Sequence, residues 1–181
     1  MMKKATLLFL FPFFLPFFLS AQGSVRATFS NSYDRWDINA GGSGTLNTTY
    51  SNSYDNWQIS IGSLSGSIRT TYSSSYGDWE ISINGKSYKL HTTFSGSYGD
   101  WELSGGDLKS SVRINSTFSN SYDSWQVNAP SGTIRISTTF SKSYDSWNIS
   151  GNLEHEDAGV KAAVAFIPAF VGAIYDKGLA K

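Results

Sequence analysis

The sequence predicts an all-β protein of six tandem β-hairpin repeats, each of about 22 residues, followed by a C-terminal helix. One motif recurs six times: aromatic, Ser, any residue, Ser, Tyr, Asp or Gly, any residue, Trp, any residue, aliphatic. Its tryptophans are spaced by 21, 22, 22, 24 and 22 residues, which indicates a repeat protein. Between copies, apolar and polar residues alternate with the period of a β-strand. The tryptophans are Trp36, Trp57, Trp79, Trp101, Trp125 and Trp147.

Residues 1–21 have the layout of a secretory signal peptide. Lys3 and Lys4 precede an apolar stretch of 13 residues, 7–19, and small residues precede the expected cleavage after Ala21. The stretch is shorter than the roughly 20 residues that a membrane-spanning helix needs. We therefore expect an extracytoplasmic protein: secreted, periplasmic or on the cell surface.

The rest of the chain divides into a six-repeat β domain, 22–151, and a helical segment, 152–181, that packs on it. The chain contains no cysteine, so the fold cannot depend on disulfides. It is long enough to bury a substantial core. Its 14 basic and 14 acidic residues balance, which argues against a nucleic-acid partner.

Each repeat is expected to fold back on itself at a turn between its tryptophan and the next motif. In the third copy Asn84-Gly85 is a strong signal for a two-residue hairpin. Folding there puts apolar residues on one face of the ribbon and polar ones on the other, and the next copies give the same result. The predicted pairs are Ile83–Lys86, Ile81–Tyr88, Trp79–Leu90, Ser82–Ser87, Glu80–Lys89, Trp101–Ile114, Leu103–Val112, Glu102–Arg113, Trp125–Ile136, Val127–Ile134 and Gln126–Arg135.

The second connection of each repeat is the Ser-x-Ser-Tyr-Asp segment itself. A two-residue turn at Asp34-Arg35 would make strands of about 13 and 5 residues alternate, leaving backbone groups of the long strands unpaired. A six-residue loop, such as SNSYDR, gives strands of about 6 residues throughout. We expect the loop, and hence twelve short antiparallel strands in an up-and-down meander. One face would carry Phe or Tyr, Trp and Ile, and the other Ser, Thr and charged residues.

An aromatic face of this kind has to be covered. The meander can close as a barrel or fold into a two-layer sheet, and the segment after Gly151 can plug or cover it. That segment is rich in alanine, with acidic residues at its start, as a buried helix with a favourable dipole requires. Pro168 would kink the helix or split it in two. The alternative fold is a β-solenoid of stacked coils.

Catalytic chemistry is not indicated. The only histidines are His91 and His155, and the sequence has neither a cysteine nucleophile nor a glycine-rich phosphate loop. Residues 154–157, Glu-His-Glu-Asp, could resemble metal ligands, but acidic residues are expected at a helix start on dipole grounds alone. We expect no enzyme, no cofactor and no metal site.

The candidate binding residues lie in the Ser-x-Ser-Tyr-Asp segments, which a meander places at one rim. Each segment combines a flat aromatic ring with hydroxyl and carboxylate groups, the chemistry that binds sugars. The exchange of Asp and Gly after the tyrosine suggests a backbone turn requirement. A column of hydroxyl groups precedes each motif, at Thr28, Thr49, Thr71, Thr93, Thr117 and Thr139. The candidate binding residues are Tyr33, Tyr54, Tyr76, Tyr98, Tyr122, Tyr144, Asp34, Asp55, Asp78, Asp100, Asp123 and Asp145.

Three functions fit these patterns. The first is a secreted or cell-surface structural and adhesive scaffold without enzymatic activity. The second is a multivalent glycan-binding module that uses the rim and has polysaccharide as its partner. The third is an outer-membrane β-barrel, which strands of about 6 residues disfavour because crossing requires 9–11. We expect a soluble protein rather than a membrane-spanning one.

Overall fold

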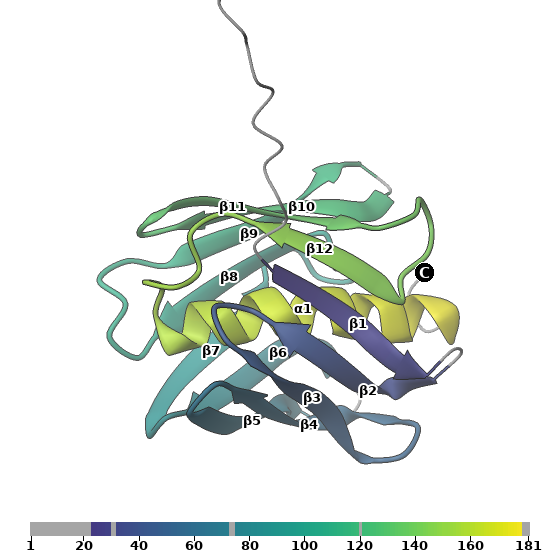
Figure 1. Cartoon of the computed structure of the whole chain (residues 1–181), viewed down its shortest axis with the longest axis horizontal. Coiled ribbons are helices and arrows are strands. Elements are labelled where there is room, and N and C mark those ends of the chain that lie inside the picture. The colour runs from purple at the N-terminus through teal and green to yellow at the C-terminus, as the bar shows by residue number, and fades with distance from the viewer. Residues whose placement is uncertain (1–22, 30–31, 73–74, 120, 179–181) are drawn as a thin grey trace, which may run out of the picture.

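The computed structural model is a closed barrel of twelve antiparallel strands with one helix inside it (Figure 1). It describes residues 23–29, 32–72, 75–119 and 121–178. Each strand pairs with its neighbours in sequence, and β1 closes the barrel by pairing with β12. The prediction of an all-β hairpin meander with a C-terminal helix is confirmed, the closed barrel is the form it takes, and the solenoid alternative is wrong. The signal-peptide prediction lies outside the described residues.

The strands are five to nine residues long, and the helix has 19 residues. Their bounds are β1 Gly23–Phe29, β2 Ser32–Asn39, β3 Ser43–Tyr50, β4 Ser53–Ile61, β5 Leu64–Tyr72, β6 Ser75–Ile83, β7 Lys86–Thr92, β8 Asp100–Gly105, β9 Val112–Phe118, β10 Ser121–Ala129, β11 Gly132–Thr138, β12 Ser146–Ser150 and α1 Ala158–Asp176.

The predicted strand register is confirmed in the three repeats for which it was derived. Ile81 faces Tyr88 across β6 and β7, and the pairs expected between β8 and β9 and between β10 and β11 also occur. Asn84 and Gly85 have φ angles of 52° and 75°, so the two-residue turn uses the left-handed conformations that this dipeptide tolerates. Alternation therefore determined which residues face the barrel interior.

The expected six-residue loop is wrong for the four hairpins β1–β2, β3–β4, β5–β6 and β9–β10, where the Ser-Tyr-Asp residues belong to the strand. Tyr50 pairs with Ser53, which leaves Ser51 and Asn52 as the turn, with Asn52 at φ 58°. The register then shifts before the pair formed by Thr48 and Trp57, because the returning strand has extra, bulged residues there. The tight turn thus lies ahead of the Ser-Tyr-Asp residues rather than at the Asp-x pair, and the strands of these four hairpins have seven to nine residues. The β7–β8 and β11–β12 connections are longer loops, as predicted.

The core is formed by the six tryptophans, the aliphatic residues of the inner wall and the helix. Helix α1 contacts strands from around the barrel, and its residues from Val160 to Ile174 are buried. Phe166 and Phe170 stack on each other and meet the edges or faces of Trp57, Trp79 and Trp101, with ring centroids 4.7–6.1 Å apart. The helix therefore fills the barrel interior as the predicted plug.

Pro168 was expected either to kink the helix or to split it in two, and the split is wrong, because helix α1 is continuous through Pro168. Residues 158–175 are long and apolar enough to cross a membrane, but 83% of that window is buried inside the barrel. Contact with the surrounding wall holds the helix together across the proline, where a hydrogen bond is missing.

Replacing Gly172 by alanine should destabilise the barrel, although alanine is the better helix former. The new methyl carbon would lie 2.5 Å from the backbone oxygen of Tyr144. Overpacking of this kind costs about 1–3 kcal/mol, which offsets or exceeds the helix-propensity gain of about 1 kcal/mol. The control is Gly77→Ala on β6, whose methyl would meet only the Thr92 hydroxyl, at 3.1 Å. Urea unfolding measures both variants, and a G172A protein more stable than wild type would contradict the tight contact.

Candidate functional site

The six Ser-x-Ser hairpins lie at one end of the barrel, which we call the Ser-x-Ser rim. Odd-numbered strands run toward this rim and even-numbered strands run away from it, so the meander places all six tips together. Helix α1 enters from the opposite end and finishes at the Ser-x-Ser rim, near the C-terminus marked in Figure 1. The predicted gathering of the candidate residues at one rim follows directly from this topology.

The six candidate tyrosines turn inward and pack on the tryptophan layer. Each ring lies 5.7–6.2 Å from the tryptophan three residues later. In all six repeats the tryptophan Nε1–H donates a hydrogen bond of 2.7–3.2 Å to the backbone oxygen of that tyrosine. This bond accounts for the constant Tyr-x-x-Trp spacing. Tyr54 and Tyr144 are buried, and the other four tyrosines are half-buried.

The tyrosines close the rim end of the core above the helix. Tyr76 and Tyr98 contact Phe170, while Tyr122 and Tyr144 contact Tyr175, the exposed last aromatic of α1. Burial raises the pKa of all four, and the Asp123 carboxylate adds to this effect at Tyr144, whose pKa reaches about 12. These phenols are therefore neutral members of the core at ordinary pH.

Two of the repeated aspartates fasten the hairpin of the next repeat. Asp34 accepts hydrogen bonds from the backbone N–H of Asn52 at 3.0 Å and from the hydroxyls of Ser51 and Thr48 at 3.0 and 3.2 Å. Asp123 holds the sixth hairpin in the same way, accepting from the Lys142 N–H and the Ser141 hydroxyl. We call this arrangement the carboxylate latch.

We expected the position after the tyrosine, which is Asp or Gly, to meet a backbone turn requirement. The structure shows a side-chain role there instead, the carboxylate latch. Gly77 and Gly99 occupy it in the third and fourth repeats, and neither has a φ angle in the left-handed region. The backbone there does not require glycine. What changes between Asp and Gly repeats is therefore the presence of the latching carboxylate.

The remaining candidate aspartates lie in different surroundings. Asp55 is a strand residue of β4, whose charge adds to the effect of burial on the pKa of Tyr76. Asp100 accepts a hydrogen bond from the side-chain amide of Asn115, and Asp145 accepts one from the Ser143 hydroxyl within its own loop. Asp78 is exposed on β6. The structure thus does not gather the six carboxylates into one cluster.

A ring of six other aromatic residues is exposed at this rim, and the sequence reasoning missed it. The first aromatic of each motif was expected on the inner face, and that expectation is wrong, because the tyrosine after the turn takes the inner position. Asn or Gly at the variable position of Ser-x-Ser could have revealed the tight turn that directs these residues outward. The rim aromatics and their exposed fractions are Phe29 58%, Tyr50 68%, Tyr72 67%, Phe94 66%, Phe118 65% and Phe140 72%.

Each rim aromatic is preceded by a threonine of the predicted hydroxyl column. Five of these threonines are exposed, and Thr28 is half-buried. In five repeats the rim therefore exposes both an aromatic side chain and the threonine before it, whereas the Thr28 hydroxyl of the first repeat is buried. An aromatic ring of this kind has an apolar face that can contact a ligand at low entropic cost, since its side chain has few rotatable bonds.

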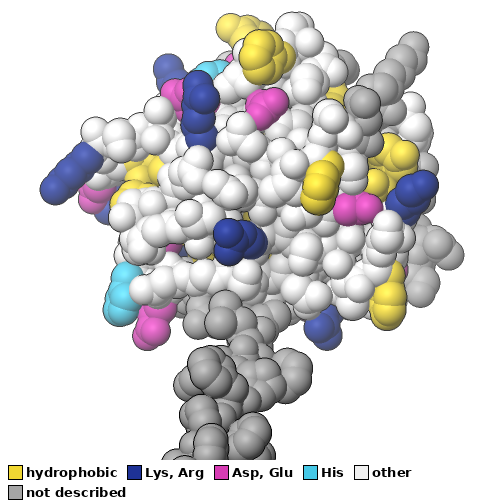
Figure 2. Space-filling view, turned by 90° about the horizontal axis from the view of Figure 1, so that it is seen from above, with side chains coloured by type: hydrophobic (Ala, Val, Ile, Leu, Met, Phe, Trp, Pro, Cys, Tyr) yellow, Lys and Arg dark blue, Asp and Glu magenta, His cyan; other side chains and the backbone are white. Residues whose placement is uncertain are grey.

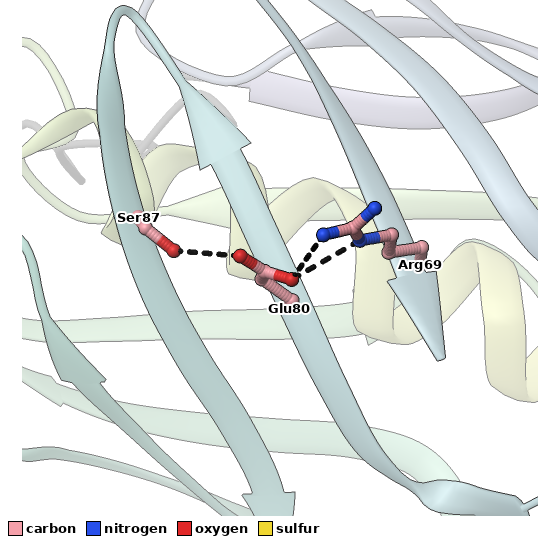
Figure 3. Close-up of polar contacts among 3 residues, drawn as sticks. All are labelled: Arg69, Glu80 and Ser87. Carbon is pink, nitrogen blue, oxygen red and sulfur yellow. Dashed lines mark hydrogen bonds and ion pairs between the residues drawn. The ribbon is translucent and has the colours of Figure 1, made fainter. Parts of the chain in front are cut away.

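The outer wall between the two ends of the barrel is polar, and its apolar side chains stand singly on the face shown in Figure 2. Glu80 on β6 pairs with Arg69 on β5 at 2.7 Å and accepts a hydrogen bond from Ser87 on β7 at 3.0 Å (Figure 3). The hydrogen bond from Arg69 is the main cause that lowers the pKa of Glu80. A groove of about 370 Å³ runs beside this network, past Tyr72 and His91.

The acidic segment before helix α1 fastens the start of the helix to the barrel. Glu156 is buried and accepts hydrogen bonds from the backbone and side chain of Ser131. Asp157 caps the helix by accepting from the Gly159 N–H at 2.8 Å. Among the described residues, no group of three His, Cys, Asp or Glu side chains is placed to hold a metal ion.

Replacing Asp34 by alanine should destabilise the protein by about 1–2 kcal/mol, because hydrogen bonds to charged acceptors contribute about this much. Asp37→Ala is the matched control, since Asp37 is an exposed carboxylate on the same strand that lies away from the hairpin tip. Denaturant unfolding compares the two. Equal stability of the D34A and D37A proteins would show that the latch contributes nothing.

The barrel should lose stability as the pH rises from about 10 through about 12. An unfolded tyrosine titrates near pH 10, whereas the pKa of Tyr144 in the fold is about 12. Folding therefore favours the neutral form, and this contribution is complete below about pH 10 and is lost progressively as the pH rises to about 12. Tyr144→Phe should flatten the alkaline decline measured by denaturant unfolding. An unchanged slope would contradict this origin of the pH dependence.

Comparisons with known proteins assign the chain to no family. No protein-family model matches it, no curated protein matches its sequence, and no solved structure matches its fold. Its function therefore has to be argued from its own residues.

Proposed function

We propose that the protein is an extracytoplasmic adhesive scaffold without enzymatic activity, which binds polysaccharide through the rim aromatics. The observation that carries this proposal is the sixfold recurrence of a largely exposed aromatic side chain, 58–72% exposed, at one position of the repeat. Large exposed apolar side chains gathered at one site commonly mark an interaction surface. Here the residues are arranged in a ring around one end of a rigid barrel.

The chemistry of the ring favours a carbohydrate. Each aromatic ring offers a flat apolar face, and in five repeats the threonine before it is exposed and has a hydroxyl group, which can donate and accept hydrogen bonds. The chain carries no formal net charge, so long-range electrostatic attraction does not favour a highly charged partner. Sugars present both apolar C–H faces and hydroxyl groups, and the rim matches both.

The spacing of the ring favours a polymeric partner. Successive rim aromatics are two strands apart, which corresponds to about 10 Å along the rim. Individual contacts of this kind are weak, but a chain that touches several of them gains avidity without any new type of contact. The polar outer wall does not favour the outer-membrane alternative, because transmembrane barrels carry an apolar band outside.

The proposal is tested by replacing all six rim aromatics with serine. The side chains are exposed, so the variant should fold, as circular dichroism and thermal unfolding will show. Binding to a glycan array and to insoluble polysaccharides should fall by at least about tenfold, since several weak contacts are lost together. The control replaces four exposed wall residues, Gln58, Lys89, Arg113 and Arg135, with serine.

Two results would contradict the proposal. One is a wild-type protein that retains no polysaccharide on the array or in pull-down experiments. The other is a rim variant that binds as well as wild type and the wall control. If the wild-type protein sediments as a dimer and the rim variant sediments as a monomer, the ring would instead be assigned to self-association.

A further inference from the structure

The six repeats are not equivalent at the rim, because Gly77 and Gly99 stand where the other four repeats have aspartate. In the first repeat the Asp34 carboxylate reaches the turn of the second hairpin and occupies the space between the two tips. In the third repeat Gly77 stands at the corresponding position. Its partners across the gap would be Ser95 and Gly96, the residues equivalent to Ser51 and Asn52. The latch is therefore missing at this hairpin.

A hollow of about 350 Å³ lies where the latch would be. It is lined by Gly77 and Asp78 of β6 and by Thr92, Ser95 and Gly96 of the fourth hairpin. Its volume falls at the lower end of the range for small-molecule sites, about 300–1,000 Å³. The backbone does not demand glycine at residue 77, so the absence of a side chain has the effect of keeping the space open.

The lining determines what class of ligand can enter. Hydroxyl groups come from Thr92, Ser95 and Ser75, and Asp78 contributes a carboxylate. The Thr92 hydroxyl corresponds to that of Thr48, which donates to the Asp34 carboxylate in the first repeat. In the third repeat this donor has no latching carboxylate opposite it. It is available to a ligand oxygen in the same place.

Two tyrosines complete the lining of the hollow. Tyr76 and Tyr98 are held in place by stacking on the tryptophans of their own repeats, at interplanar angles of 14° and 27°. Both are half-buried and rest on Phe170 of the helix. The two tyrosines are therefore rigid parts of the lining, which reduces the entropic cost of binding.

The same lining disfavours charged ligands. Among the described residues around the hollow, none is basic, and Asp78 would repel an anion. A calcium ion would need several oxygen ligands with more than one carboxylate, and Asp78 is the only one. A neutral polyhydroxy ring matches the hydroxyls, the carboxylate and the two tyrosines together.

We propose that the hollow at Gly77 is a binding site for a single neutral sugar residue. It is separate from the ring of rim aromatics, none of which lines it. The proposed role of that ring can therefore fail while this site stands, and the reverse also holds. Asp78 lines both this hollow and the outer groove beside Tyr72, so a longer saccharide could leave the hollow along the wall.

The test is an NMR titration of the ¹⁵N-labelled protein with the methyl glycosides of glucose, galactose, mannose and N-acetylglucosamine. At least one glycoside should shift the backbone amides of Gly77, Thr92 and Gly96 in a saturable way. Gly77→Asp should build the latch to Ser95 and Gly96, raise the melting temperature and weaken binding by at least about tenfold. Asp78→Asn keeps the shape of the hollow and should also weaken binding, whereas Asp37→Asn, on the wall of β2, should not.

The proposal is overturned if none of the four glycosides shifts these amides. It is equally overturned if the folded Gly77→Asp protein binds with wild-type affinity. Should that variant fail to fold, wild-type affinity in the Asp78→Asn protein would have the same meaning. The variant that lacks the six rim aromatics should retain these shifts, which separates this site from the polysaccharide-binding ring.

Discussion

The structure depends on the contact between helix α1 and the tryptophan layer of the barrel wall. Twelve strands enclose a space of about 23–25 Å in diameter, which is wider than the wall side chains can fill unaided. The helix fills it, and Phe166 and Phe170 meet the tryptophans at its centre. Gly159 and Gly172 let it approach Tyr88 and Tyr144 closely. The interior of the barrel is therefore filled by the helix and the side chains of the wall.

Each copy of the repeated motif has an internal role and a connecting role. Within a repeat, the tryptophan N–H donates to the backbone oxygen of the tyrosine three residues earlier, which stabilises the bulge after the turn. Between repeats, Asp34 and Asp123 hold the turn of the following hairpin. Neighbouring hairpins are thus coupled at their tips as well as through their strands. At Gly77, where glycine replaces the aspartate, the latching carboxylate is absent and a hollow lies in its place.

The aromatic residues of the motif also have different roles. The tyrosine and tryptophan of each motif belong to the core. Burial raises the pKa of four of these tyrosines, Tyr76, Tyr98, Tyr122 and Tyr144. The first aromatic of each motif points outward and adds nothing to that core. Contact with a partner is the role that we propose for these exposed aromatics. This reasoning directs attention away from the tyrosines and toward the rim aromatics.

The sequence by itself determined the hairpin meander, the pairing register and the buried C-terminal helix, because alternation, the Asn84-Gly85 turn and a continuous apolar helix are local signals. Closure into a barrel depended on β1 meeting β12, a contact between the two ends of the β domain that no local pattern encodes. The inward or outward direction of the first aromatic was likewise decided by the bulge, since a shift in register reverses the faces of a strand. The carboxylate latch and the hollow at Gly77 join residues about 18 positions apart. Only the tertiary structure brings those residues together.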